Sequence, residues 1–193
     1  PPQAAGFSEH RLGHFLDENI GPAYGVLLGV GAGEVAQELL RSWTGGVLFL
    51  VDPYIHLRRG YYRDANVEDD DHQRQYENLR NVLHDTPGLQ GRFSFVREFS
   101  FVVPSVWREK NWGPRPKFVY QDANPSYDAV RSDLRAWWPL LASGGIMAGK
   151  NYTNVGDGSV VGVRHAVDEF AAASHLTVFV TIDPEPSWLL LKE

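Results

Sequence analysis

The sequence predicts an α/β fold: a doubly wound, mostly parallel sheet of seven strands that ends in an antiparallel hairpin. Two observations carry this prediction. Apolar runs rich in β-branched residues alternate with helical patterns along nearly the whole chain, which is typical of βαβ units. The last two apolar runs are joined only by Asp183-Pro184-Glu185-Pro186. A crossover between parallel strands needs about a dozen residues, so this short link indicates a hairpin.

The expected strands are short runs of Val, Ile, Leu and aromatic residues: Tyr24–Leu28, Val47–Val51, Phe93–Phe99, Phe118–Tyr120, Ile146–Ala148, Thr177–Ile182 and Trp188–Leu191. The expected helices carry apolar residues three and four positions apart: Glu9–Glu18, Val35–Trp43, His72–His84, Val102–Trp107, Ser126–Leu141 and Val160–Ala173. In the longest of them the core stripe is Tyr127, Val130, Leu134, Trp137, Trp138 and Leu141.

Length and composition fit one soluble domain over residues 1–193, with residues 1–20 as a helical extension. The chain has no cysteine, which excludes a disulfide scaffold, thiolate metal sites and a cysteine nucleophile. Its formal net charge of -6 argues against nucleic acid or an anionic membrane as the main partner. We see no signal peptide and expect a cytoplasmic protein. The first residue is Pro1, which fits a processed chain or a domain of a longer protein.

A glycine-rich turn follows the first expected strand. Gly29, Gly31 and Gly33 lie where the backbone must turn sharply and can approach a ligand closely. The dinucleotide pattern G-x-G-x-x-G would need glycine where this chain has Glu34, which disfavours a pyrophosphate. Asp52 ends the next strand, where a carboxylate can accept both hydroxyls of a ribose. Loop and acid together predict a nucleoside site; the alternatives are a tight turn without ligand and a surface carboxylate.

Longer segments of the chain resemble those of a known family. Leu28–Ala36 and Leu50–Tyr54 match its opening, and Tyr120–Tyr127 matches a segment written Y-I-D-A-x-H-x-Y. Asp133–Trp138 and Gly144–Gly149 match D-L-x-A-W-W-P and GG-x-x-A-G-H-D-Y, and Gly162–Phe170 and Pro186–Trp188 extend the match. In these segments the chain resembles class I S-adenosylmethionine-dependent methyltransferases, specifically the group called methyltransferase domain 24. The likeness covers about residues 8 to 193.

The resemblance implies S-adenosylmethionine as cofactor, S-adenosylhomocysteine as product and a Rossmann-like fold. The implied cofactor-binding residues are Gly29, Val30, Gly31 and Gly33 around the methionine part, Asp52 at the ribose, and Pro53, Tyr54, Phe99 and Ser100 around the adenine. Asp122, at the end of the fourth strand, would face the sulfonium and the acceptor.

The chain departs from the family where the family places histidines. Pro125 stands at one of these positions, and Lys150-Asn151-Tyr152 replaces H-D-Y at the other. Asp122 and Asn151 could still bind a divalent cation, but the ammonium of Lys150 would enter the same space. We therefore expect no metal.

The candidate catalytic residues are Asp122, Lys150 and Tyr152. A sulfonium is already electrophilic, so the protein must align the displacement and deal with the acceptor's proton. Beside Asp122, Lys150 would stay charged and stabilise a developing alkoxide. The alternatives are a neutral Lys150 that takes the acceptor's proton as a base and a solvent-exposed lysine.

Three functions follow from these residues. The first is an O-methyltransferase acting on a small molecule or a glycan. The second is a catalytically weakened cofactor-binding or scaffold module, because both family histidines are missing. The third, an NAD-dependent oxidoreductase, is disfavoured by Glu34 and by the terminal hairpin. Residues in the loops would suit a sugar or aromatic acceptor, or would pack over the loops: Arg58, Arg59, Tyr61, Tyr62, Arg63, Trp107 and Trp112.

Overall fold

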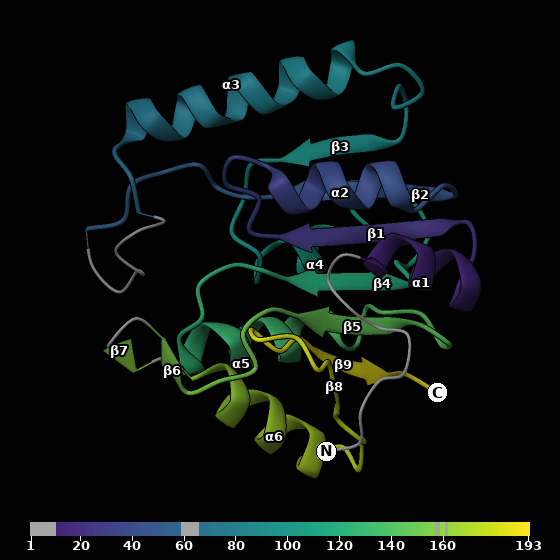
Figure 1. Ribbon diagram of the computed structural model, residues 1–193, viewed down its shortest axis with the longest axis vertical. Helices are drawn as coiled ribbons and strands as arrows, with labels where there is room; N and C mark the ends of the chain where they lie inside the picture. Colours follow the sequence, from purple (N-terminus) through teal and green to yellow (C-terminus); the bar gives the residue numbers. More distant parts are fainter. Residues whose placement is uncertain (1–10, 59–65, 157–158, 161) are drawn as a thin grey trace.

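The computed structural model describes residues 11–58, 66–156, 159–160 and 162–193. Its main sheet has seven strands in the order β3-β2-β1-β4-β5-β9-β8 (Figure 1). The strands are β1 (Ala23–Leu28), β2 (Gly46–Val51), β3 (Phe93–Val96), β4 (Phe118–Gln121), β5 (Ile146–Gly149), β8 (Phe179–Val180) and β9 (Trp188–Leu191). The first five are parallel, and β9 runs antiparallel to both β5 and β8. The predicted fold class, including the closing hairpin, is confirmed.

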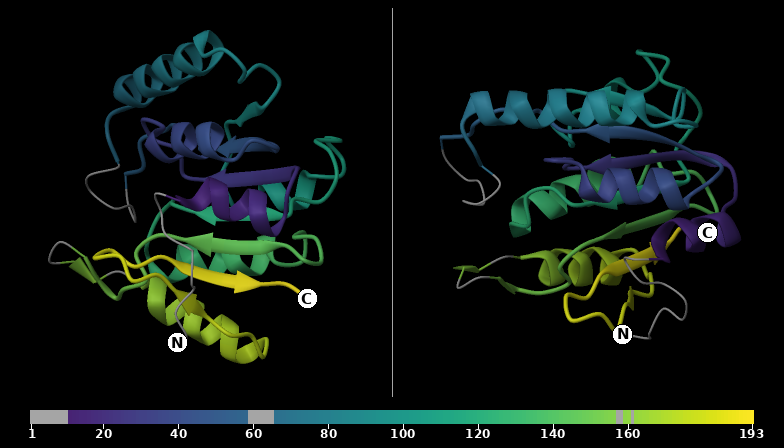
Figure 2. Two further views of the ribbon diagram at one scale, coloured as in Figure 1. Left: turned by 45° about the vertical axis from the view of Figure 1, so that its right-hand side comes forward. Right: turned by 45° about the horizontal axis from the view of Figure 1, so that its top comes forward.

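Helices cover both faces of this sheet (Figures 1 and 2). One face carries α1 (Leu12–Asn19), α2 (Glu34–Ser42) and α3 (Asp69–Asp85), whose apolar residues share one core cluster. The other carries α4 (Val103–Val106), α5 (Tyr127–Trp137) and α6 (Val163–Ala173), whose apolar residues share a second cluster. The chain is therefore doubly wound.

Each central strand contributes to both clusters because successive side chains of a strand point to opposite faces. In β1, Leu27 lies in the α1–α3 cluster, whereas Val26 and Leu28 lie in the α4–α6 cluster. In β5, Met147 lies in the α4–α6 cluster, whereas its neighbours Ile146 and Ala148 lie in the α1–α3 cluster. This explains why the strands read as continuous apolar runs instead of alternating ones.

The strand order reverses between β1 and β4. From β1 the chain winds outward through β2 to β3, and it then returns to place β4 on the other side of β1. Ligands of open α/β sheets bind at such a switch point, beyond the carboxyl ends of the strands. The fold thus directs attention to the residues that follow β1, β2, β4 and β5.

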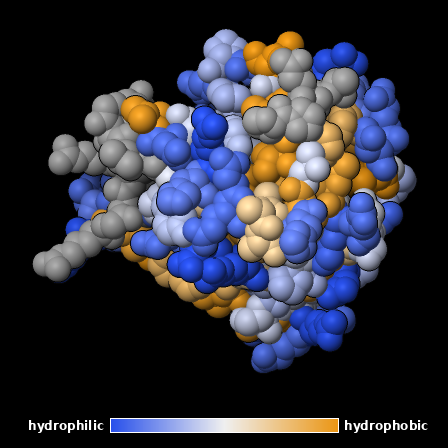
Figure 3. All heavy atoms as spheres, turned by 90° about the horizontal axis from the view of Figure 1, so that it is seen from below, coloured by the Kyte–Doolittle hydropathy of each residue, from blue (hydrophilic) through white to orange (hydrophobic). Residues whose placement is uncertain are grey.

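Two strands are shorter than the sequence predicts, and in both cases the neighbouring strand ends. The Phe93–Phe99 run stops at Val96, which pairs with Val51, the last residue of β2. The Thr177–Ile182 run is a strand only at Phe179–Val180, and it stops at Val180 because its partner β9 begins opposite that residue. β8 is an edge strand, and a short edge limits pairing with other chains. Seen from the side of α6 and β8, hydrophilic residues dominate the surface, with hydrophobic ones between them (Figure 3).

The helix bounds differ from the predictions for local reasons. α5 ends at Trp137 instead of Leu141, since Pro139 cannot continue a helix. α3 begins at Asp69, so the acidic residues form its first turn, where they complement the helix dipole. The expected first helix begins within residues 1–10, outside the described residues. The structure also adds a small hairpin of β6 (Val155–Gly156) and β7 (Ser159–Val160) before α6. Among the described residues, no helix is long and apolar enough to cross a membrane.

Candidate active site

The residues that follow four neighbouring strands lie in one row at the carboxyl edge of the sheet. Each of their amides donates to a carbonyl of an adjacent strand: Gly29 to Val51 (2.9 Å), Asp52 to Val96 (3.2 Å), Asp122 to Leu28 (2.8 Å) and Lys150 to Gln121 (3.1 Å). The sheet hydrogen bonds thus continue one residue beyond the strands. This continuation brings together residues that are far apart in the sequence.

The three glycines after β1 serve different purposes. A Cβ on Gly29 would lie 2.4 Å from the carbonyl oxygen of Asp122, so only glycine allows the two strand ends to meet this closely. A Cβ on Gly33 would lie 2.3 Å from the side chain of Leu79 on α3. Gly31 has a left-handed φ of +51°, and a Cβ there would meet nothing within 4 Å. Gly31 is therefore the glycine that leaves space for a ligand.

Asp52 holds this glycine loop. Its Oδ2 accepts hydrogen bonds from the amides of Val30 (2.8 Å) and Gly31 (3.1 Å), and its Oδ1 accepts one from the amide of Tyr54 (2.8 Å). The ring of Tyr54 is buried, and its hydroxyl donates to the Gly31 carbonyl (3.1 Å). Burial, followed by the nearby charge of Asp52, raises the pKa of Tyr54, so this hydroxyl remains a donor. The sequence did not indicate this supporting role for Asp52 and Tyr54.

A cavity of about 150 Å³ opens between the ends of β1, β2 and β4 and the chain that follows β3. Five of the predicted cofactor-binding residues line it: Gly29, Asp52, Pro53, Phe99 and Ser100. Seven others complete the lining: Val51, Leu57, Phe101, Ala123, Asn124, Ala129 and Asp133. The cavity is thus mostly apolar, with a carboxylate from β2 and another from α5.

Helix α5 holds Ser100 at two points. The Ser100 hydroxyl donates to Oδ1 of Asp133, and the Ser100 carbonyl accepts a hydrogen bond from the indole of Trp137 (3.0 Å). Asp133 is only 2% exposed, and this burial raises its pKa to about 7 despite the hydrogen bond from Ser100. Sequence reasoning assigned no role to Asp133. The available signal was a carboxylate next to Leu134 on a helix face that is otherwise apolar.

Two of the three predicted catalytic residues lie together. Nζ of Lys150 is 3.7 Å from Oδ2 of Asp122, and both side chains are 27% exposed. The pair is formed by the ends of β4 and β5, and the Asp122 carbonyl contacts the glycine loop at Gly29. In the part of the chain that the structure describes, no three His, Cys, Asp or Glu residues cluster as possible metal ligands.

The third predicted catalytic residue, Tyr152, is engaged with α6. Its hydroxyl donates to Asp168, and the guanidinium of Arg164 lies over its ring, 5.6 Å from the centroid. Burial and the hydrogen bond to Asp168 raise the pKa of Tyr152 to about 12. At neutral pH this hydroxyl therefore keeps its proton, and that proton is donated to Asp168.

The aromatic residues proposed for an acceptor divide into two groups. Trp107 is 1% exposed and packs edge-to-face against Phe49 and Trp137, so the packing alternative holds for it. Trp112 packs edge-to-face against Trp107. Arg59, Tyr61, Tyr62 and Arg63 lie outside the described residues, and Arg58 is exposed.

Comparison with known proteins supports this description. A family model described as a methyltransferase domain matches residues 23–152. That range contains the glycine loop, Asp52, Asp122 and Lys150. A search of curated proteins finds no match.

Solved structures of methyltransferases share the fold. CalS11, a calicheamicin methyltransferase also described as a TDP-rhamnose 3'-O-methyltransferase, is 16% identical, with a TM-score of 0.66 over 94% of this chain and 76% of that one. The O-methyltransferase NovP is 17% identical, with a TM-score of 0.63 over 96% and 78%. PaMTH1 of Podospora anserina, solved with S-adenosylhomocysteine bound, is 13% identical, with a TM-score of 0.57 over 94% and 76%. At such identities the likeness supports the fold.

Proposed function

The chain belongs to the methyltransferase-domain family of S-adenosylmethionine-dependent enzymes, and we propose that it methylates a hydroxyl oxygen of a small molecule or carbohydrate. The observation that carries this proposal is the Asp122–Lys150 pair beside the glycine loop. A charged pair at this point can act on the acceptor oxygen.

The carboxyl edge of the sheet suits the cofactor in two respects. Gly31 leaves open space where the backbone can approach the methionine part. The cavity between Asp52 and Ser100 offers apolar walls for a base and a carboxylate for the ribose hydroxyls. Asp52 already accepts three backbone hydrogen bonds. A carboxylate has about four lone-pair directions, so it can accept a further bond from a ribose.

When bound, S-adenosylmethionine supplies a methyl group on a positively charged sulfur, which leaves as a neutral thioether. The protein must hold the acceptor oxygen in line with the methyl carbon and the sulfur. The hydroxyl loses its proton as its bond to carbon forms. The ammonium of Lys150 can stabilise the negative charge that develops on that oxygen, and Asp122, 3.7 Å away, keeps Lys150 charged and oriented. The proton then passes to solvent or to Asp122.

The same pair leads us to propose that no divalent cation is needed. The Lys150 ammonium already sits beside the carboxylate that would have to bind the metal, and a second positive charge there would be repelled. Asp122 and Asn151 would be the ligands if a cation did bind.

Two features support the acceptor class. CalS11, which shares this fold, is described as acting on a sugar nucleotide and NovP as an O-methyltransferase. The net charge of -6 disfavours polyanionic acceptors such as RNA. We therefore propose an uncharged hydroxyl on a small molecule or sugar.

Transfer of a labelled methyl group tests the proposal. The wild type is incubated with labelled S-adenosylmethionine and with pools of sugar nucleotides, phenols and, separately, RNA, with and without EDTA. We expect labelling of a hydroxyl acceptor that EDTA does not change. Lys150→Met, which keeps the side-chain length and removes the charge, should lower the rate at least about tenfold, or about 1.4 kcal/mol of barrier.

Lys117→Met is the matched control. Lys117 is an exposed lysine directly before β4, at the opposite edge of the sheet, and its loss should leave the rate unchanged. EDTA inhibition that magnesium reverses would show a metal site and contradict our assignment of Lys150. Labelling of RNA alone would contradict the acceptor class. Cofactor binding without transfer to any acceptor would favour the scaffold alternative.

A further inference from the structure

The cavity contains a buried acid that the proposed chemistry does not use. Asp133 projects from α5 into a lining made mostly of apolar residues such as Phe99 and Ala129, and it is 2% exposed. Burying a carboxyl group costs free energy unless hydrogen bonds compensate for it. The Ser100 hydroxyl donates one such bond. Because this burial costs free energy, we looked for a role of Asp133 in binding the ligand of the cavity.

Within the described ranges, no cationic side chain pairs with this acid. Among the described residues that line the cavity, Asp52 and Asp133 are the only titratable ones. On the chain after β3, the carboxylate of Glu98 accepts from the Phe99 amide (2.8 Å). Helix α4, which packs against α5, has the sequence VPSV and no ionisable side chain. The electrostatic surroundings of Asp133 are therefore set by burial and by Ser100.

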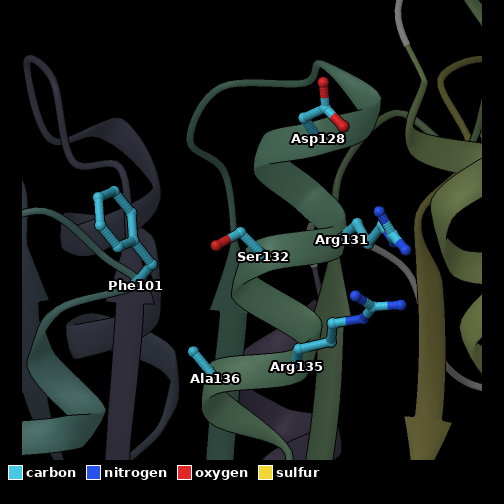
Figure 4. A pocket seen from close by; sticks show the side chains of 6 residues that line it. All are labelled: Phe101, Asp128, Arg131, Ser132, Arg135 and Ala136. Atoms are coloured by element: carbon cyan, nitrogen blue, oxygen red, sulfur yellow. The ribbon is translucent and has the colours of Figure 1, made fainter.

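The arginines of α5 serve another surface. Arg131 and Arg135 border a hollow of about 410 Å³ on the outside of the helix, and their side chains point away from Phe101 (Figure 4). Arg131 pairs with Glu169 of α6 (3.6 Å). Asp128 also borders this outer hollow. The charges on α5 and α6 are thus paired or directed elsewhere, and Asp133 remains a carboxyl group whose described partner is a hydroxyl.

The bond to Asp133 gives Ser100 a fixed polarity. A hydroxyl has one hydrogen to donate and two lone pairs that accept. When its hydrogen is committed to an ionised Asp133, Ser100 can present only lone pairs to the cavity. Trp137, one turn after Asp133, holds the carbonyl of the same serine (3.0 Å) and so fixes its backbone. The cavity wall is therefore pre-organised to accept a hydrogen bond from a ligand.

We propose that Asp133 is a positioning residue that makes the Ser100 hydroxyl an acceptor for the 6-amino group of the cofactor's adenine, and thereby selects adenine over a 6-oxo purine. The inference rests on the proposed function, in which the adenine occupies this cavity. An amino group at position 6 can donate a hydrogen bond to the Ser100 oxygen. An oxo group at position 6 can only accept, so its lone pairs would lie against those of Ser100 and no hydrogen bond would form. A site built to pair a polar group of its ligand rejects the analogue that cannot make the pair.

Two ligands that differ only at position 6 test this inference. The dissociation constants of S-adenosylhomocysteine and S-inosylhomocysteine are measured by calorimetry for the wild type, Ser100→Ala and Asp133→Leu. At pH 8 the wild type should prefer the adenine ligand at least about tenfold. In both variants the preference should fall to less than about threefold. Ser132→Ala is the control: Ser132 precedes Asp133 in the sequence and borders the outer hollow (Figure 4), but it is not among the described residues that line the cavity, so this variant should keep the wild-type ratio.

The ratio of the two constants separates selection from mere stabilisation of the fold. A structural role for Asp133 would weaken both ligands equally and leave the ratio unchanged, which would overturn the inference. A pH series on the wild type gives an independent readout, because at pH 6 a protonated Asp133 can donate to Ser100 and release its hydroxyl hydrogen. The preference should then fall, and a constant ratio from pH 8 to pH 6 would contradict us. Equal binding of both ligands to the wild type would refute only this inference, whereas no binding of either would refute the proposed function.

Discussion

Replacing Asp52 with alanine removes one carboxylate that we assign to two tasks. In the free protein it accepts hydrogen bonds from the amides of Val30, Gly31 and Tyr54, at 2.8–3.1 Å. In the complex it would also accept a bond from the ribose. The substitution should therefore lower both the stability of the free protein and its affinity for S-adenosylhomocysteine.

The magnitudes follow from the number and surroundings of these bonds. A hydrogen bond to a charged group contributes about 1.5–3 kcal/mol, but the cavity beside Asp52 allows water to replace part of that. We therefore expect the free energy of unfolding to fall by about 1–3 kcal/mol in total. Loss of the ribose bond should weaken binding by about 1.5–3 kcal/mol, which is roughly 10- to 150-fold in the dissociation constant.

Asp17→Ala supplies a matched control for this experiment. Asp17 also accepts three hydrogen bonds, two from Thr44 (3.0 and 2.9 Å) and one from the amide of Gly45 (3.4 Å), and it lies at the amino edge of the sheet. Its loss should lower stability and leave the affinity unchanged. Urea unfolding and calorimetry measure the two quantities separately. Wild-type affinity in Asp52→Ala would show that the ribose is held by other residues, and wild-type stability would refute the supporting role of Asp52.

Three further predictions concern single residues. Saturating S-adenosylhomocysteine at 100 times its dissociation constant should stabilise the wild type by about 2.7 kcal/mol, or about 5–10 °C in melting temperature, and Gly31→Arg should abolish this shift by filling the open space at the loop. Tyr152→Phe should keep the transfer rate within about threefold and cost about 1 kcal/mol of stability, because the hydroxyl is bonded to Asp168; a hundredfold loss of rate would instead support Tyr152 as a catalytic residue. The pKa of Asp133 in the folded protein is about 7, above the value of about 4 expected in the unfolded chain. The contribution of its protonated form to stability is therefore complete below about pH 4 and is lost as the pH rises through 7. The unfolding free energy of the wild type minus that of Asp133→Asn should therefore fall by about 2–3 kcal/mol from pH 5 to pH 8, and a flat difference would show that burial does not perturb this acid.

The sequence predicts the centre of the sheet well because β2, β4 and β5 and most of β1 are buried on both faces. Runs such as Val47–Val51 have no polar residue to obscure them, and the observed strand begins one residue earlier, at Gly46. The short link Asp183–Pro186 is sufficient to predict the antiparallel hairpin of β8 and β9. Such features are local, and local patterns can be read without knowing the fold.

Bounds that depend on a distant partner could not be predicted in this way. Whether Arg97–Phe99 continues β3 depends on the end of β2 at Val51, about 45 residues earlier in the chain. The β6–β7 hairpin is not among the predicted elements for a different reason. Asp157-Gly158 separates its strands in the sequence, and this dipeptide is a strong hairpin signal that two-residue strands make easy to miss.

The sequence predicts which residues lie at the carboxyl edge of the sheet, but it does not predict the hydrogen bonds that each of them makes. Strand ends predict that Asp52, Asp122 and Lys150 lie near one another, and the hydrogen bonds beyond the strands place them in one row. Periodicity cannot show that Asp52 holds three amides or that the hydroxyl of Tyr152 is bonded to α6. These contacts depend on loop conformations, such as the left-handed φ of +51° at Gly31.

Asp133 shows how a conflict between levels of sequence reasoning can locate a functional residue. It lies between Val130 and Trp137 on the buried stripe of α5, where the pattern requires an apolar side chain. The residues three and four positions away are Ala129, Val130, Ala136 and Trp137, so no neighbouring charge on the helix could compensate for it. A sequence selected only for stability would place leucine there, since local and global preferences normally agree in a folded chain. Its one described partner is the hydroxyl of Ser100, which lines the same cavity as Asp133 and Asp52, so the position of this carboxylate agrees with the role in ligand binding that we propose for it.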